Sequence, residues 1–135
     1  MTQYDLHPLE SGRSLGSRIN LDSIHYFPDG LDIDIEDFYF PGREKYKISF
    51  GAGVLSVRIC NESYLLDVPW GWTSSEPSGI VPSVGFSEES ALIDEFHKVS
   101  MGVRSGQKVF HVAVLTQQEW IDVLCLSLPV ISPIN

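Results

Sequence analysis

Hydrophobic and polar residues alternate along much of the chain, as they do in strands that bury one face and expose the other. The clearest alternation lies in 31–36, where every second residue is aliphatic and the residues between are carboxylates. A Pro-Asp-Gly turn directly before this segment predicts a hairpin. Strands are predicted over 21–27, 31–40, 46–50, 55–60 and 64–68, with a second hairpin formed by 109–115 and 120–128.

One segment has helical periodicity instead. Leu92, Phe96 and Val99 recur at spacings of four and three, and charged residues lie off that stripe. Ser87 stands before two glutamates and is a suitable N-cap for the positive end of a helix. A glycine soon after the last apolar residue suits the C-terminal end. A helix is therefore predicted over 88–99.

Two segments follow neither period. Residues 1–18 contain glycine, serine and arginine with little apolar pattern, and they predict a loosely ordered N-terminal arm. Residues 69–86 contain three prolines and three glycines, and they predict a long loop. Loops of that length inside a domain are usually functional or mobile.

The segment 117–126 allows two interpretations. A helix is the alternative to a strand, because Thr116 and Glu119 have the spacing of a capping box. The β-branched residues and the proline that follows favour the strand. Regular structure is predicted to end at Pro129 and Pro133.

Length and composition fit one globular domain. The chain has 135 residues, 43% of them hydrophobic and 20% charged, which suffices to bury a core without disulfides. The predicted fold is α+β: a single domain over 1–135, predominantly antiparallel β-sheet of sandwich-like or half-barrel-like form, with one helix packed on a sheet face. Cys60 and Cys125 lie in apolar strands and are expected to be buried, reduced thiols.

The charge balance excludes some partners. The chain has eighteen acidic and nine basic residues, for a formal net charge of −9. A nucleic-acid partner is not expected, because phosphate contacts need clustered lysine and arginine, and an anionic membrane surface is disfavoured for the same reason. The sequence has neither a secretory signal nor an apolar run long enough for a transmembrane helix. A cytoplasmic protein is predicted.

The negative charge concentrates on one predicted strand face. Asp32, Asp34 and Glu36 form what we call the acidic rail, flanked by Asp29 and Asp37. Carboxylates at steps of about 6.6 Å along a strand repel one another unless they are solvated or meet cations. The functional interpretation is a docking surface for a basic protein, such as a nuclease-type toxin. The alternative is a solvated edge strand that uses charge to prevent edge-to-edge pairing.

Other candidate sites are weaker. No metal site is predicted, because a strand points its carboxylates in parallel and does not wrap them around an ion. Trp70 and Trp72 point to opposite sides if their segment is extended, so that one is available as a partner anchor; the alternative is that both pack over a sheet edge. The predicted partner-binding residues are Asp29, Asp32, Asp34, Glu36, Asp37, Trp70 and Trp72.

Catalytic motifs are not found. The sequence lacks a phosphate-binding glycine loop, a serine nucleophile elbow and a CxxC pair. His111 lies in the apolar strand 109–115, which is predicted to be central and covered, so a hydrogen-bonded core histidine is expected. A nucleophile pair of Cys60 and His111 stays open as an alternative. No catalytic residue and no cofactor are predicted.

Five segments of the chain carry a resemblance to a known family: Ile48–Phe50, Val57–Ile59, Ser90–His97, His111–Thr116 and Trp120–Leu124. They resemble segments of a family of small bacterial proteins, whose members look like the immunity or antitoxin-like proteins found with polymorphic toxins. The resemblance covers roughly residues 46–131 and implies a fold and a binding role, without catalytic residues.

The predicted function is therefore a non-catalytic cytoplasmic immunity protein that neutralises a basic toxin domain. Two alternatives of other classes stay open. One is a small-molecule-binding domain or unrecognised enzyme with a pocket between sheet and helix. The other is a self-associating structural module.

Overall fold

The fold is built mainly from antiparallel strands. The computed structural model describes residues 2–12, 15–16, 18–38, 44–61, 70–103 and 106–134. The helices are α1 (Ala91–Val99) and the 3-10 turn η1 (Glu10–Gly12). The strands are β1 (Thr2–Asp5), β2 (His7–Pro8), β3 (Ile19–Phe27), β4 (Gly30–Asp37), β5 (Lys45–Phe50), β6 (Val54–Asn61), β7 (Trp70–Thr73), β8 (Val84–Ser87), β9 (Phe110–Leu115), β10 (Glu119–Cys125) and β11 (Val130–Pro133).

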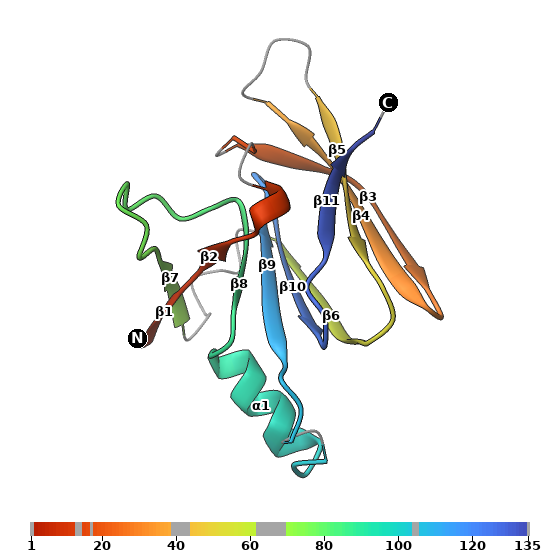
Figure 1. Cartoon of the computed structure of the whole chain (residues 1–135), viewed down its shortest axis with the longest axis vertical. Helices are drawn as coiled ribbons and strands as arrows, with labels where there is room; N and C mark the ends of the chain where they lie inside the picture. Colours follow the sequence, from red (N-terminus) through yellow and green to blue (C-terminus); the bar gives the residue numbers. More distant parts are fainter. Residues whose placement is uncertain are drawn as a thin grey trace.

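Two antiparallel sheets share one core (Figure 1). The five-stranded sheet has the order β2-β8-β9-β10-β6, and the four-stranded sheet has the order β11-β5-β4-β3. A separate parallel pair joins β1 to β7. The predicted α+β class, with predominantly antiparallel sheet and one helix, is confirmed.

The inter-sheet core follows directly from the period-two pattern. On β4 the aliphatic residues Leu31, Ile33 and Ile35 are fully buried, and the residues between them are partly exposed. From the other sheet, Val112 of β9 and Val123 of β10 enter the same apolar cluster. Each such side chain contributes about 1.5–3 kcal/mol when it is fully removed from water. The core is therefore the main source of stability for both sheets.

The link between β5 and β6 passes from one sheet to the other. β5 pairs with β4 and β11, whereas β6 pairs with β10. Residues 51–53 make this crossing, and Gly53 has a φ of +97°, which side chains other than glycine rarely adopt. The glycines at 51 and 53, between the strands predicted over 46–50 and 55–60, therefore lie where the chain changes sheet.

The second predicted hairpin is also confirmed, and 119–125 is a strand. Gln117 and Gln118 form the short turn between β9 and β10. The Thr116 hydroxyl oxygen accepts the Glu119 N–H at 2.9 Å, and the hydroxyl lies 3.0 Å from the Glu119 carboxylate. The capping-box pattern closes a hairpin here, because the β-branched residues that follow pair with both neighbouring strands.

The helix begins later than predicted. Its N-cap is Ser90, whose Oγ accepts the Ile93 N–H at 3.2 Å, and Ser87 is the last residue of β8. The C-terminal end is as predicted, since the Gly102 N–H donates to the His97 carbonyl at 2.8 Å.

The buried face of α1 also differs from the predicted stripe. Leu92 and Ile93 are buried, whereas Val99 is 76% exposed. The reason is that α1 meets the sheet through its first turns, and its C-terminal end extends beyond the end of β9 (Figure 1). The spacing of apolar residues predicts which side of a helix is buried, but not how much of its length is in contact with the sheet.

The N-terminal segment is not a loose arm. β1 pairs with β7, and β2 pairs with β8. Leu6 and Leu9 are buried at 1% and 4% exposure. Two apolar residues spaced in this irregular way carry no periodic signal, yet they anchor the described part of this segment to the core.

Two further predictions are wrong. The segment 69–86 is not one continuous loop, because it contains β7 and β8. Regular structure does not end at Pro129, because β11 pairs with β5 at the sheet edge. An edge strand tolerates Pro133, whose missing N–H costs nothing on the unpaired side. The predicted strand over 64–68 and the end of the strand predicted over 31–40 lie outside the described residues.

Candidate functional site

The acidic rail lies on the outer face of the four-stranded sheet. Strand alternation turns Asp32, Asp34 and Glu36 away from the core. β4 is an interior strand, paired with β3 on one side and β5 on the other. The edge position in the alternative interpretation is therefore wrong, because an interior strand has no free edge to protect. A solvated sheet face remains the alternative to a docking surface. Among the described residues, both apolar clusters lie on other faces.

Lysines from β5 partly compensate the rail. The Lys47 ammonium lies 3.8 Å from Asp32 and 3.9 Å from Asp34, so that one cation is shared by two carboxylates. Lys45 reaches Asp22, on β3, at 3.5 Å. All of these groups are partly exposed, and ion pairs of that kind contribute only about 0–1 kcal/mol. The face therefore stays available for charges brought by a partner.

The two residues expected to flank the rail lie in different environments. Asp29 is exposed in the turn between β3 and β4. Asp37 is fully buried, and its Oδ2 accepts the Gly16 N–H at 2.9 Å. Alternation along β4 explains this, because Asp37 falls on the same face as the buried isoleucines. Asp37 thus ties the N-terminal segment to the sheet and is not presented to a partner.

The two tryptophans lie on β7, which pairs with β1 and belongs to a different sheet from the rail. Trp72 is half-buried, and its ring meets the His111 imidazole edge-on with centroids 5.0 Å apart. It belongs to the apolar cluster around α1. The backbone of Trp70 pairs with Thr2 of β1, and its side chain lies outside the described part. Packing of Trp72 fits both interpretations, since each of them has at least one tryptophan packed, and the anchor prediction therefore rests on Trp70.

A chain of buried polar side chains lies on the opposite side of the molecule from the rail. His111 Nε2 is 2.6 Å from the Asp122 carboxylate, and His111 Nδ1 is 2.8 Å from the Ser90 hydroxyl. A carboxylate accepts hydrogen bonds, which places the imidazole proton on Nε2 and lets Nδ1 accept from the serine. The predicted core histidine is confirmed, but its partners were missed. They lie 21 and 11 residues away in sequence, so spacing gave no signal.

Serine, histidine and carboxylate in this order have the connectivity of a nucleophilic triad. Here, however, His111 is fully buried, Ser90 is 1% exposed and Asp122 is 5% exposed. The Ser90 oxygen also accepts the Ile93 N–H as the N-cap of α1. A substrate has no approach to such a serine. The arrangement satisfies buried polar groups, as folded cores require.

The cysteines form no nucleophile pair with His111. Cys60 and His111 lie on the two strands that flank β10. Cys60 of β6 pairs with Trp120 of β10, whereas His111 of β9 pairs with Leu124, four residues farther along β10. Both cysteines are free. Burial raises the pKa of the Cys125 thiol to about 12. The predicted buried, reduced state holds for Cys125, whereas Cys60 is half-buried.

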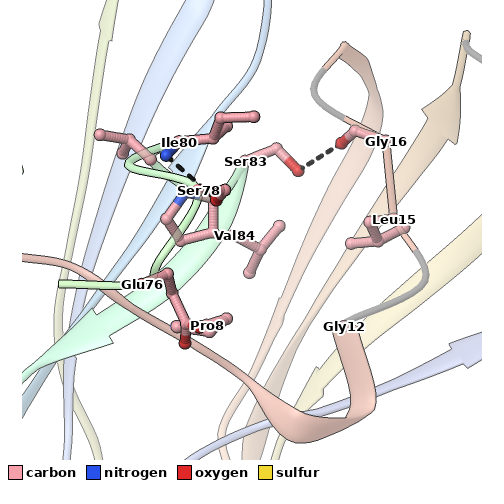
Figure 2. A pocket seen from close by; sticks show the side chains of 11 residues that line it. Pro8, Gly12, Leu15, Gly16, Glu76, Ser78, Ile80, Ser83 and Val84 are labelled. Carbon is pink, nitrogen blue, oxygen red and sulfur yellow. Dashed lines mark hydrogen bonds between the residues drawn. The ribbon is translucent and has the colours of Figure 1, made fainter. Parts of the chain in front are cut away.

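The described residues line a cavity of about 350 Å³ between the N-terminal segment and the loop before β8. Figure 2 shows Leu15, Ile80 and Val84 around it. Ser83 donates to the Gly16 carbonyl at 3.0 Å and so joins its two walls (Figure 2). The space between α1 and the sheet, where a pocket was predicted, is instead occupied by the apolar cluster that includes Leu92.

A second cavity, of about 380 Å³, is polar. Its lining includes Asp5, Glu88 and Glu89 together with His7. In the part of the chain that the structure describes, no group of three or more histidine, cysteine or carboxylate side chains is arranged to hold a metal ion. The same part contains no helix with the length and apolar character needed to cross a membrane.

Comparisons with protein-family models, with curated proteins and with solved structures found no match to this chain. The resemblance to immunity proteins therefore stays a prediction. Any function has to be argued from the sheet faces, the buried polar chain and the cavities.

Proposed function

We propose that this chain is a non-catalytic binding protein of the immunity type, which neutralises a basic protein partner through the outer face of its four-stranded sheet. The observation that carries the proposal is the position of the acidic rail. Three carboxylates project from one face of an interior strand, where they are not needed to prevent edge pairing. Such a ladder is unfavourable for the free protein, and a positively charged partner would relieve its self-repulsion.

The overall charge supports the same partner class. A protein with a net charge of −9 attracts basic proteins over distances greater than its contacts. Toxin domains that act on phosphate backbones are basic, because phosphate contacts need clustered lysine and arginine. This chain is strongly acidic instead, which is why it is not expected to bind nucleic acid itself. An acidic protein that covers such a surface would exclude the substrate.

A non-catalytic role is supported by the burial of the Ser90–His111–Asp122 chain. Within the described residues it is the arrangement closest to a catalytic one, and the serine that would attack is sealed from solvent. Its hydrogen bonds are already used by the helix cap and the imidazole. We therefore assign it to folding.

The proposal is tested by measuring association with the product of the neighbouring reading frame. The pair should form a complex, and co-expression should relieve any toxicity of that product. In Asp32→Asn/Asp34→Asn the association rate at low salt should fall about tenfold, because exposed charges act mainly by steering encounter. Most of the difference should disappear near 1 M salt, where the Debye length is about 3 Å.

The matched control is Asp94→Asn/Glu95→Gln on the exposed side of α1, which removes the same formal charge. It should slow association much less than the rail variant. Equal slowing by both variants would show that overall charge, and not the rail, guides the partner. Failure to detect any complex with the neighbouring product would overturn the immunity assignment.

A second candidate function is small-molecule binding in the cavity of Figure 2. Its volume of about 350 Å³ falls in the usual range for ligand pockets, about 300–1,000 Å³. Its lining combines apolar side chains such as Ile80 with polar ones such as Glu76 and Ser78, and so favours a small ligand that has both apolar and polar groups. In a thermal-shift screen, a true ligand should raise the Tm of the protein but not that of Ile80→Trp, which places a bulky ring at the exposed lining residue Ile80. Equal shifts in both proteins would exclude the cavity.

A further inference from the structure

Two exposed aromatic side chains mark one end of the rail. Tyr26 is 67% exposed and Phe27 is 44% exposed, at the end of β3 next to the turn to β4. Aromatic residues bury large areas when they take part in a core, and adjacent exposed ones are typical of binding surfaces. The sequence pattern assigned this segment only to a hairpin. The structure shows that the hairpin carries apolar surface into solvent.

Phe27 belongs to the same sheet face as the rail. It lies opposite Gly30, and His25 lies opposite Asp32, so these β3 side chains stand beside the outward-facing carboxylates of β4. The rings of His25 and Phe27 are stacked, with centroids 6.4 Å apart and planes 15° from parallel. Tyr26 lies opposite Leu31 and extends the aromatic surface on the other side of the hairpin.

Asp29, exposed in the turn, extends the negative charge of the rail at this same end. The cross-strand neighbours of Asp34 and Glu36 on β5 are lysines, whereas the neighbour of Asp32 is Ser49. Lys47 does reach Asp32, but it is shared with Asp34. No ion pair to Asp29 is found among the residues that the structure describes. Negative charge and exposed aromatic surface therefore coincide at the hairpin end.

We propose that the β3–β4 hairpin end is the docking point for an arginine side chain of the basic partner. A planar guanidinium can stack on the Phe27 ring while it donates hydrogen bonds to Asp32 or Asp29. Arginine fits better than lysine, because its guanidinium is planar, more weakly hydrated and able to pair with a carboxylate in two places. The partner class rests on the proposed function, and the inference adds where the partner docks and by which side chain.

The test uses isotope-labelled protein and two short peptides of equal length and charge, one rich in arginine and one rich in lysine. Titration with the arginine peptide should shift backbone amide resonances mainly over 25–32, and the lysine peptide should bind more weakly. Phe27→Ala should lower the affinity for the arginine peptide about fivefold, as expected for loss of a cation–π contact. Met101→Ala, at an 89% exposed apolar residue far along the chain, is the matched control and should change nothing.

Other outcomes would overturn the inference. Shifts centred on Glu88 and Glu89, equal affinity for both peptides, or equal loss in Phe27→Ala and Met101→Ala would each exclude an arginine site at the hairpin. Its failure is distinguishable from failure of the proposed function. If the neighbouring product binds and Phe27→Ala has no effect on that complex, the docking point is wrong and the function stands. If that product does not bind but the arginine peptide shifts resonances over 25–32, the arginine site stands and the proposed function is wrong.

Discussion

The outer faces of the two sheets carry similar side chains in opposite surroundings. On the five-stranded sheet, His111 and Asp122 project toward Ser90, Trp72 and the apolar cluster around α1, and they are buried. On the four-stranded sheet, Asp32 and its neighbours on the rail project toward solvent, where Lys47 is shared between Asp32 and Asp34.

The role of a polar residue in an alternating strand therefore depends on whether another element covers its face of the sheet. A covered face must satisfy each polar group with a fixed hydrogen-bond partner, because leaving it unpaired costs about 1–3 kcal/mol. A bare face is satisfied by water, mobile ions and partly exposed ion pairs, so its charges contribute little to folding. The covered face is therefore expected to matter for stability and the bare face for association.

The largest expected effect comes from breaking the covered face. His111→Ala should destabilise the protein by about 3–5 kcal/mol, because it leaves the buried Asp122 carboxylate without its partner and opens a cavity. Urea unfolding followed by circular dichroism measures this. A loss below about 1 kcal/mol would mean that water enters the site, and that the two faces differ less than their burial suggests.

A smaller effect is expected at the helix cap. Ser90→Ala removes both the N-cap acceptor and the hydrogen bond to His111, and should cost about 1–2 kcal/mol. Ser78→Ala, in an exposed loop, serves as the comparison and should cost less than about 0.5 kcal/mol. Equal melting temperatures for the two variants would place the helix start elsewhere, for example at Ser87.

The buried Cys125 thiol in the core between the two sheets should make the unfolding free energy depend on pH. Burial raises the pKa of Cys125 from 9.0 to about 12, so the unfolded chain releases this proton first as the pH rises. The stability that the buried thiol contributes is full below pH 9 and is lost between about pH 9 and 12, by roughly 1 kcal/mol at pH 10. Comparing the unfolding free energy of the protein with that of Cys125→Ala at pH 8 and pH 10 isolates this change. An equal loss in both proteins would contradict it.

The smallest effect should come from the bare face. Asp32→Asn should change the unfolding free energy by less than about 0.5 kcal/mol, because the carboxylate is partly exposed and shares its lysine with Asp34. The urea unfolding experiment used for His111→Ala measures this change in free energy. A loss comparable to that variant would make the rail structural and would remove its availability for a partner.

Much of the fold was accessible from local pattern. The alternation of Leu31, Ile33 and Ile35 with carboxylates placed β4 and its faces correctly, because side chains in a strand always alternate. The wrong predictions share a cause. The burial of Leu6, the pairing of β11 and the start of α1 at Ser90 all depend on segments that are distant in sequence.

Periodicity and turn residues were enough to predict the β-rich class, both hairpins, the one helix, the acidic rail and a core position for His111. Contacts between distant segments make β4 an interior strand and bring Ser90 and Asp122 to His111. The same kind of contact determines which sheet face is covered. Periodicity defines two faces for each strand, but burial is set by what packs against them, and that contact comes from residues with no fixed spacing along the chain.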